Sequence, residues 1–202
     1  MVPTITPDID DIPAFLQSTD VIDWEHAAVR RKSDSLTTGA STVNEKVRTL
    51  FEWVRDVIPH SKDAGLDVVP CNASEVLKAG TGICYTKSHL LVALLRAQRI
   101  PAGLYYQVLR RDSPLNGMVL HGLSAVYMED SHEWLLLDPR GNTNGCNAQF
   151  GAKDEGLAFR TNGDTGELTY STVYHRPASV VVNALRTYGS RTKLWPHLPT
   201  NL

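Results

Sequence analysis

GTGICYTKSHLLVALLRAQRIPAG, residues 80–103, is a glycine-containing loop that runs into an apolar pattern of helical type. The helix should end near Gln98, because Pro101 cannot continue it. Cys84 then stands in the first turn, where free backbone N–H groups and the helix dipole favour a thiolate over a thiol. The stretch therefore predicts a helix that presents a nucleophile. The alternative is that Cys84 is a small buried hydrophobe at the start of a core helix.

Two further helices are predicted before this stretch. Thr42-Val-Asn-Glu45 has the form of a capping box, and apolar residues then recur at helical spacing, which predicts a helix over 43–57. Asn72-Ala-Ser-Glu75 repeats the capping pattern for a short helix that ends at Gly80.

The pattern changes to strands after the cysteine helix. Leu104–Leu109, Val119–Tyr127 and Trp134–Leu137 are short runs rich in β-formers, and residues 129–132 indicate a hairpin turn between the last two. The fold class is therefore predicted to be α+β, with helices followed by an antiparallel sheet.

The remaining sequence predicts a loop and a last helix. Residues 141–162 are rich in Gly, Asn and Ala without periodicity, whereas Pro177–Tyr188 has an apolar helical face. A chain of 202 residues suits one domain, so residues 1–202 are interpreted as a single domain with a core over about 43–140. Residues 141–202 are its loop and helical extension.

Composition excludes several classes of protein. Lys and Arg number 20 against 22 Asp and Glu, and no basic block with interleaved aromatics is present, so we expect no nucleic acid partner. The longest apolar run, Leu90–Leu95, is too short to span a bilayer. Residues 1–30 do not resemble a signal peptide. We therefore expect no membrane association and a cytoplasmic location.

The cysteines argue against a disulfide framework. There are three, Cys71, Cys84 and Cys146, so at least one thiol is free. A bridge between Cys71 and Cys146 is an open alternative that a cytoplasmic setting disfavours. No spacing typical of a zinc site is present, and we expect no metal and no cofactor.

Two polar residues on the predicted hairpin complete a catalytic set. His121 lies near the start of one strand and Asp138 at the end of the next, so their side chains can meet across an antiparallel pair. A thiolate nucleophile needs an imidazole base and a third group that orients the imidazole. Cys84, His121 and Asp138 are therefore a candidate triad. The alternative for Asp138 alone is a turn residue before Pro139.

The backbone around the cysteine offers further chemistry. The N–H groups of the first turn, including that of Cys84, can hold a developing oxyanion, and Gly82 would let a substrate approach closely. Other polar residues are assigned no role: His60 is interpreted as a surface or structural residue, and Arg140 as a solvated charge.

These motifs together resemble the transglutaminase-like superfamily of papain-like cysteine enzymes, and among them a small, single-domain, bacterial-type member. The resemblance is carried by Gly82-Ile-Cys84, Leu94-Leu-Arg96, Ile100-Pro-Ala102, His121 and Trp134-Leu-Leu-Leu-Asp138-Pro139. It implies a cysteine helix packed on an antiparallel sheet that carries the histidine and the aspartate.

The resemblance also implies a role for each residue. Cys84 would be the nucleophile, His121 the base and Asp138 the orienting residue. The family's upstream side-chain oxyanion donor has only a weak counterpart, Asn72. A second departure is His121-Gly-Leu123, where the family often has an aromatic residue two positions after the histidine.

The implied activity is cysteine-dependent acyl transfer on an amide bond through a Cys84 thioester. Hydrolysis of a peptide or other amide-containing substrate is favoured, because small members of the family are more often proteases or amidases. Transfer to an amine, as in a transglutaminase or an amide-forming ligase, is the first alternative. A noncatalytic module that binds a peptide or partner is the second, and an acyltransferase that uses a coenzyme thioester is the third.

Overall fold

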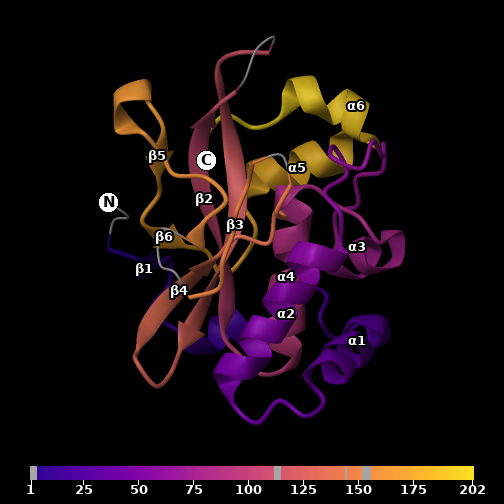
Figure 1. Cartoon of the computed structure of the whole chain (residues 1–202), viewed down its shortest axis with the longest axis vertical. Coiled ribbons are helices and arrows are strands. Elements are labelled where there is room, and N and C mark those ends of the chain that lie inside the picture. Colours follow the sequence, from indigo (N-terminus) through magenta and orange to yellow (C-terminus); the bar gives the residue numbers. More distant parts are fainter. Residues whose placement is uncertain (1–3, 112–114, 144, 152–155) are drawn as a thin grey trace.

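Helix α4 (Cys84–Ala97) is the central element of the fold (Figure 1). Every residue from Tyr85 to Arg96 is buried, and α4 packs against helices on one side and strands on the other. A helix that is largely apolar all round requires such surroundings. The computed structural model describes residues 4–111, 115–143, 145–151 and 156–202.

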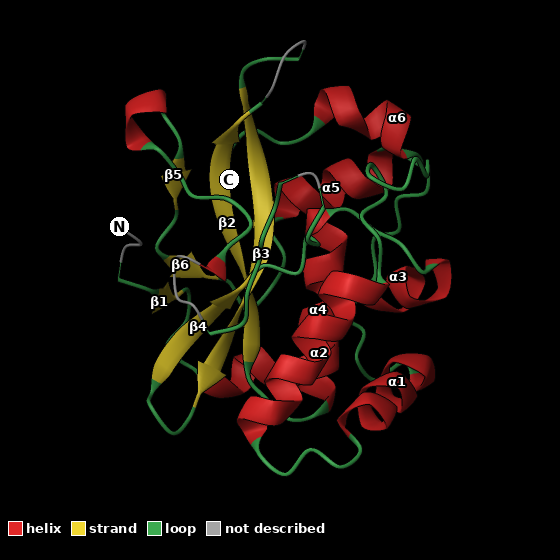
Figure 2. Cartoon of the chain, viewed as in Figure 1, coloured by secondary structure: helices red, strands yellow, loops and turns green. Residues whose placement is uncertain are grey.

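The other helices lie on the same side of the sheet as α4, and the first three of them along the chain pack directly against α4 (Figure 2). They are α1 (Ala27–Thr37), α2 (Val43–Val57), α3 (Ala73–Ala79), α5 (Ser179–Thr187) and α6 (Arg191–Leu194). Short 3-10 helices cover Ile12–Leu16, Gly163–Thr165 and Trp195–His197.

The caps of α2 and α3 form at the residues that the sequence predicts. Thr42 Oγ1 accepts the N–H of Glu45, and the Glu45 carboxylate accepts the N–H of Thr42, which confirms the capping box of α2. Gly80 ends α3 in the left-handed conformation, with φ of 64°. The predicted last helix corresponds to α5.

The main sheet has four strands in the order β4-β3-β2-β5. Its strands are β2 (Ala102–Arg110), β3 (Met118–Met128), β4 (Glu133–Leu137) and β5 (Leu168–Thr169), and all neighbouring pairs are antiparallel. Two short parallel strands, β1 (Thr6–Pro7) and β6 (Thr172–Val173), form a second sheet. The α+β class and the packing of the cysteine helix on an antiparallel sheet are confirmed.

The register of β3 against its neighbours positions the site. His121 pairs with Gln107 of β2, and Ser124 pairs with Leu137, the last residue of β4. Asp138 follows immediately, so it leaves the sheet beside the segment of β3 that carries His121. Within the described part of residues 141–162 no α-helix or strand is assigned, as the loop prediction requires.

A buried arginine joins distant segments to this core. Arg96, near the end of α4, donates hydrogen bonds to the carbonyls of Ala102 at 2.8 and 3.0 Å, of Gln17 at 2.7 Å and of His175 at 2.7 Å. The N-terminal and C-terminal segments therefore pack on the same helix that carries Cys84. The division into a single domain stays a prediction.

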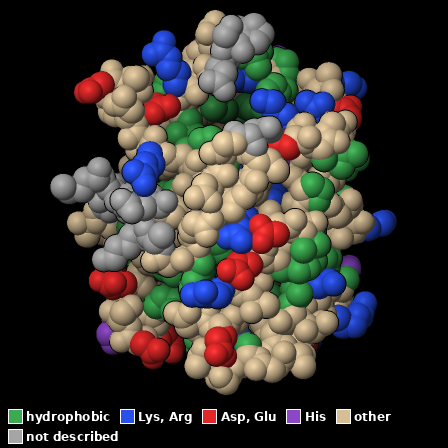
Figure 3. Space-filling model, in the orientation of Figure 1, with side chains coloured by type: hydrophobic (Ala, Val, Ile, Leu, Met, Phe, Trp, Pro, Cys, Tyr) green, Lys and Arg blue, Asp and Glu red, His purple; other side chains and the backbone are tan. Residues whose placement is uncertain are grey.

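The surface seen in Figure 3 shows basic and acidic side chains interspersed, without a large patch of one sign. In the part of the chain that the structure describes, no helix combines the length and the apolar character that a bilayer crossing requires.

Candidate active site

Cys84 begins α4, as predicted, and the loop before it is fixed by local hydrogen bonds. The N–H of Ile83 donates to Thr86 Oγ1 at 3.0 Å, which closes the first turn. Cys84 is only half-buried, whereas the residues that follow it from Tyr85 to Arg96 are buried. The thiol therefore lies at the partly exposed start of a core helix, close to the N–H groups of the first turn.

Gly82 lets two segments of the chain meet next to Cys84. It pairs with His60 in a parallel bridge, and its carbonyl accepts the N–H of Ser61 at 2.9 Å. A Cβ at position 82 would collide with Thr86 Oγ1, so the glycine accommodates the first turn of α4. The proposed approach of a substrate at Gly82 stays a prediction.

The first turns of α4 are bound to β3 around His121. Tyr85 donates its hydroxyl hydrogen to the carbonyl of Leu120, and Ser88 donates to the carbonyl of Gly122 at 3.2 Å. A Cβ on Gly122 would lie 2.7 Å from Cδ1 of Tyr85. The glycine after His121 therefore allows α4 to approach β3 this closely.

His121 and Asp138 form a buried pair. His121 Nε2 lies 2.8 Å from Asp138 Oδ2, and the two side chains are 5% and 0% exposed. Asp138 also accepts the N–H groups of Arg140 at 3.1 Å and Ala158 at 3.2 Å. Each carboxylate oxygen is thus held in place by the main chain.

The pair shifts the protonation of both members. Burial alone would lower the pKa of His121, but the charge and hydrogen bond of Asp138, with a smaller contribution from Cys84, raise it to about 10. Burial would raise the pKa of Asp138, yet His121 and the two main-chain donors hold it below its ordinary value. The resting pair is therefore an imidazolium beside a carboxylate.

The thiol completes the arrangement. The Cys84 thiol lies near enough to the imidazole to contribute, less than Asp138 does, to the raised pKa of His121. The structure thus brings Cys84, His121 and Asp138 together in the order that the candidate triad requires; their catalytic roles stay predictions.

Asn72 stands at the N-terminus of α3. Its main-chain N–H donates to Glu75 at 3.1 Å, and the same carboxylate oxygen accepts the N–H of Cys71 at 2.9 Å. Asn72 is therefore the N-cap residue of α3. Its role as an oxyanion donor stays a prediction without support from these contacts.

An aromatic side chain lies beside the imidazole of His121. It is not residue 123, where the family often has an aromatic residue and this chain has Leu123, but Phe159. The ring of Phe159 meets His121 edge-on, with ring centroids 5.0 Å apart and planes at 83°. Phe159 belongs to the loop that follows β4, whose sequence has no periodicity. No local signal in the sequence could have placed it at the site.

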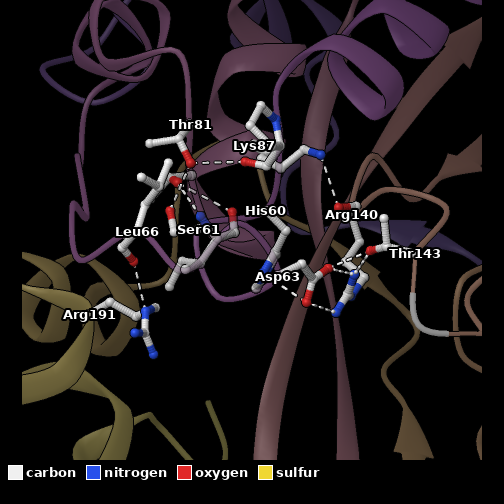
Figure 4. Close-up of polar contacts among 12 residues, drawn as sticks. His60, Ser61, Asp63, Leu66, Thr81, Lys87, Arg140, Thr143 and Arg191 are labelled. Carbon is white, nitrogen blue, oxygen red and sulfur yellow. Dashed lines mark hydrogen bonds and ion pairs between the residues drawn. The ribbon is translucent and has the colours of Figure 1, made fainter.

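Arg140 and His60 are two further residues near the site, and both are buried. Arg140 is 9% exposed and binds both oxygens of Asp63 at 2.5 and 3.2 Å, so its interpretation as a solvated charge is wrong (Figure 4). His60 is 6% exposed, with Nδ1 4.0 Å from Asp63. Burial and the nearby Arg140 lower the pKa of His60 to about 3, so its imidazole is neutral.

These residues line a pocket next to the triad. Its volume is about 310 Å³, and it lies between the end of α2, the segment around His60 and the segment 140–143 that follows Asp138. In the described part of the chain no group of three or more His, Cys, Asp or Glu residues is placed to hold a metal ion. All three cysteines are free, so the open alternative of a bridge between Cys71 and Cys146 does not occur.

Comparison with solved structures places the fold. A protein proposed to be a cysteine protease from Cytophaga hutchinsonii superposes with a TM-score of 0.52 at 20% identity, over 69% of this chain and 46% of that one. The periplasmic domain of TgpA from Pseudomonas aeruginosa gives a TM-score of 0.45 at 16% identity, over 65% and 48%. The chain thus spans about half the length of these neighbours. At such identities the likeness concerns the fold alone.

Comparison with sequences identifies the family. A search of curated proteins finds no match. A sequence model of the transglutaminase-like superfamily matches residues 30–139, more than half of the chain, and this range contains Cys84, His121 and Asp138. The chain belongs to the transglutaminase-like superfamily.

Proposed function

We propose that the protein catalyses acyl transfer from an amide through a thioester on Cys84, with water as the usual acceptor. Membership of the superfamily supports a cysteine-dependent enzyme. The single observation that carries the proposal is the buried contact of His121 with Asp138 at 2.8 Å, next to the half-buried Cys84 that contributes to the raised pKa of the imidazole.

The geometry supports a two-step reaction. The Cys84 thiolate attacks the amide carbonyl, and the oxyanion that forms lies near the N–H groups at the start of α4. The C–N bond then breaks as the His121 imidazolium gives its proton to the leaving amine. Neutral His121 next takes a proton from water, whose oxygen attacks the thioester carbonyl. The C–S bond then breaks, which releases a carboxylic acid and restores the Cys84 thiolate beside the His121 imidazolium.

An amine can replace water in the second step. The C–N bond then forms instead of a C–O bond, and the product is a new amide, as in a transglutaminase or a ligase. Hydrolysis is favoured by the resemblance to small hydrolytic members of the family. The proposed cytoplasmic setting suits either reaction, because a reducing compartment keeps Cys84 as a free thiol.

The test is product analysis with a peptide mixture in water enriched in oxygen-18. Hydrolysis predicts new carboxyl groups that carry the label. Transamidation predicts instead an adduct when a small primary amine is added. Cys84→Ala should abolish both products, whereas Cys146→Ala, which removes a thiol outside the triad, should retain them.

Two results would overturn the proposal. Turnover that persists in Cys84→Ala would exclude a thioester on Cys84 as the intermediate. Absence of any product, together with unmodified Cys84 and saturable binding of a peptide from the mixture, would establish the noncatalytic binding module instead.

A further inference from the structure

Lys87 is a buried lysine one helical turn after the nucleophile. Its side chain is 0% exposed, although lysine is almost never fully buried unless it is paired. Nζ donates hydrogen bonds to two main-chain carbonyls, of Arg140 at 2.9 Å and of Arg55 at 3.2 Å. Figure 4 shows the contact with Arg140.

The acceptor at Arg140 is close to the triad. Arg140 lies two residues after Asp138, and its N–H donates to Asp138 Oδ1 at 3.1 Å. The other oxygen of Asp138 lies 2.8 Å from His121. A continuous chain of contacts therefore runs from Lys87 through the main chain of residue 140 to the carboxylate and the imidazole.

A glycine makes room for the ammonium group. Gly141 has φ of 112°, in the region that side chains disfavour, and a Cβ there would lie 3.4 Å from Lys87 Nζ and 3.3 Å from the carbonyl of Arg55. A side chain at position 141 would be strained in this conformation and would crowd the carbonyl of Arg55 that accepts from Lys87. This observation is independent of the hydrogen bonds.

The burial of Lys87 has a free-energy cost. Loss of hydration lowers the pKa of Lys87 to about 7, opposed mainly by the charge of Asp138. An apolar side chain of similar length would fill this space without losing hydration of a charge. What Lys87 supplies beyond volume is therefore its N–H donors.

We propose that Lys87 is a positioning residue for the triad: it holds the segment after Asp138 against the helix that carries Cys84. One helical turn then sets both ends of the triad, the thiol directly and the carboxylate through the carbonyl of Arg140. The inference rests on the proposed function only for the use of the triad, since the contacts themselves are independent of it.

The test measures the pKa of His121 by NMR on histidine-labelled protein, together with the alkylation rate of Cys84. In Lys87→Met the loss of a nearby positive charge alone would raise the pKa of His121. Displacement of Asp138 would lower it, and we expect a fall of about one unit or more. Alkylation of Cys84 should slow about tenfold, as expected for a misplaced reactive group.

Two further variants separate positioning from stability. Lys78→Met removes an exposed lysine of α3 and should change neither readout. Lys87→Gln removes the charge but keeps N–H donors, so its His121 pKa and its Cys84 alkylation rate should lie between those of wild type and Lys87→Met. If Lys87→Met does not fold, the comparison of Lys87→Gln with wild type is the test. A lower melting temperature with an unchanged pKa of His121 and an unchanged rate at Cys84 would overturn the proposal.

The two proposals can fail separately. If Lys87 variants shift His121 but no substrate is turned over, positioning stands and the proposed function falls. If product forms at the wild-type rate in Lys87→Met, the proposed function stands and positioning falls.

Discussion

At the scale of single residues, the state of one imidazole decides what the site can do. Burial would lower the pKa of His121, but the charge and hydrogen bond of Asp138 raise it to about 10, so His121 is protonated at neutral pH and can serve as the acid of the proposed reaction. A protonated base of this kind must release its proton to the leaving group before it can activate water. In the proposed reaction, the buried carboxylate of Asp138 thus keeps on His121 the proton that the leaving amine receives.

Asp138→Asn tests this dependence. Asparagine keeps the shape but removes the charge, so burial should dominate and the pKa of His121 should fall from about 10 to below its ordinary value. Activity should decrease by about a hundredfold or more, since a positioned acid-base group contributes factors of this size. An NMR titration of His121 beside turnover rates makes the comparison. An imidazole that titrates as in wild type would exclude the charge of Asp138 as the cause.

The residues that sequence reasoning could place are those at the ends of elements. Cys84 follows two nearby glycines and opens a helix, His121 lies on the first strand of a hairpin and Asp138 directly follows the second strand, so local signals located all three. Lys87 and Phe159 were missed. A lysine within an apolar helix gives no sign that its head is buried, and the position of Phe159 depends on a loop without periodicity.

At the scale of elements, the contact between α4 and β3 assembles the site. Tyr85 and Ser88 bond to carbonyls on either side of His121, and Gly122 allows the close approach. Helix and strand are thus fixed to each other at the point where thiol and imidazole meet.

Gly122→Ala tests the closeness of this contact. The new methyl group meets the ring of Tyr85, so either the ring or the helix must move, and we expect a loss of about 1–3 kcal/mol in the free energy of unfolding. The alkylation of Cys84 should slow as well. Gly163→Ala is the control, since a Cβ there meets nothing within 4 Å. Equal urea midpoints and equal alkylation rates for the two variants would contradict this role.

Element boundaries were predictable where caps and prolines mark them, as in α2 and α4. Helix α1 was not predicted. Its buried side chains are Val29, Ser33 and Thr37, a stripe in which two of three residues are polar, so a search for apolar periodicity does not find it. The two-residue strand β5 was missed because its partner β2 lies about sixty residues earlier, and such pairing has no local signal.

At the scale of the whole molecule, polar groups within the core couple stability to pH. His89, on α4, is 1% exposed and its Nδ1 lies 2.9 Å from the carbonyl of Cys71. Burial lowers the pKa of His89 to about 4, against a smaller opposing effect of this hydrogen bond. The unfolded chain, with an ordinary histidine, binds a proton between these two values and the folded chain does not. Stability is therefore lost as the pH falls from about 6.5 towards 4.

His89→Gln should reduce this sensitivity to acid. Between about pH 7 and 5 the buried imidazole should account for about 2 kcal/mol of the decrease in the free energy of unfolding. Urea unfolding of wild type and variant at both pH values gives the difference. His132→Gln, at an exposed turn position, controls for histidine removal. Equal decreases in the free energy of unfolding of wild type and His89→Gln would show that protonation of other groups causes the loss of stability.

The measurement that tests the central claim most directly is the alkylation rate of each cysteine by iodoacetamide across pH, read by peptide mass spectrometry in wild type and His121→Ala. Burial raises the pKa of Cys71 and of Cys146, so both should react slowly. Cys84 should react much faster than either near neutral pH, and His121→Ala should remove this advantage, because the imidazolium that stabilises the thiolate is gone. A rate at Cys84 no higher than at Cys146, or one unchanged in His121→Ala, would contradict the assignment of Cys84 and His121 as nucleophile and base.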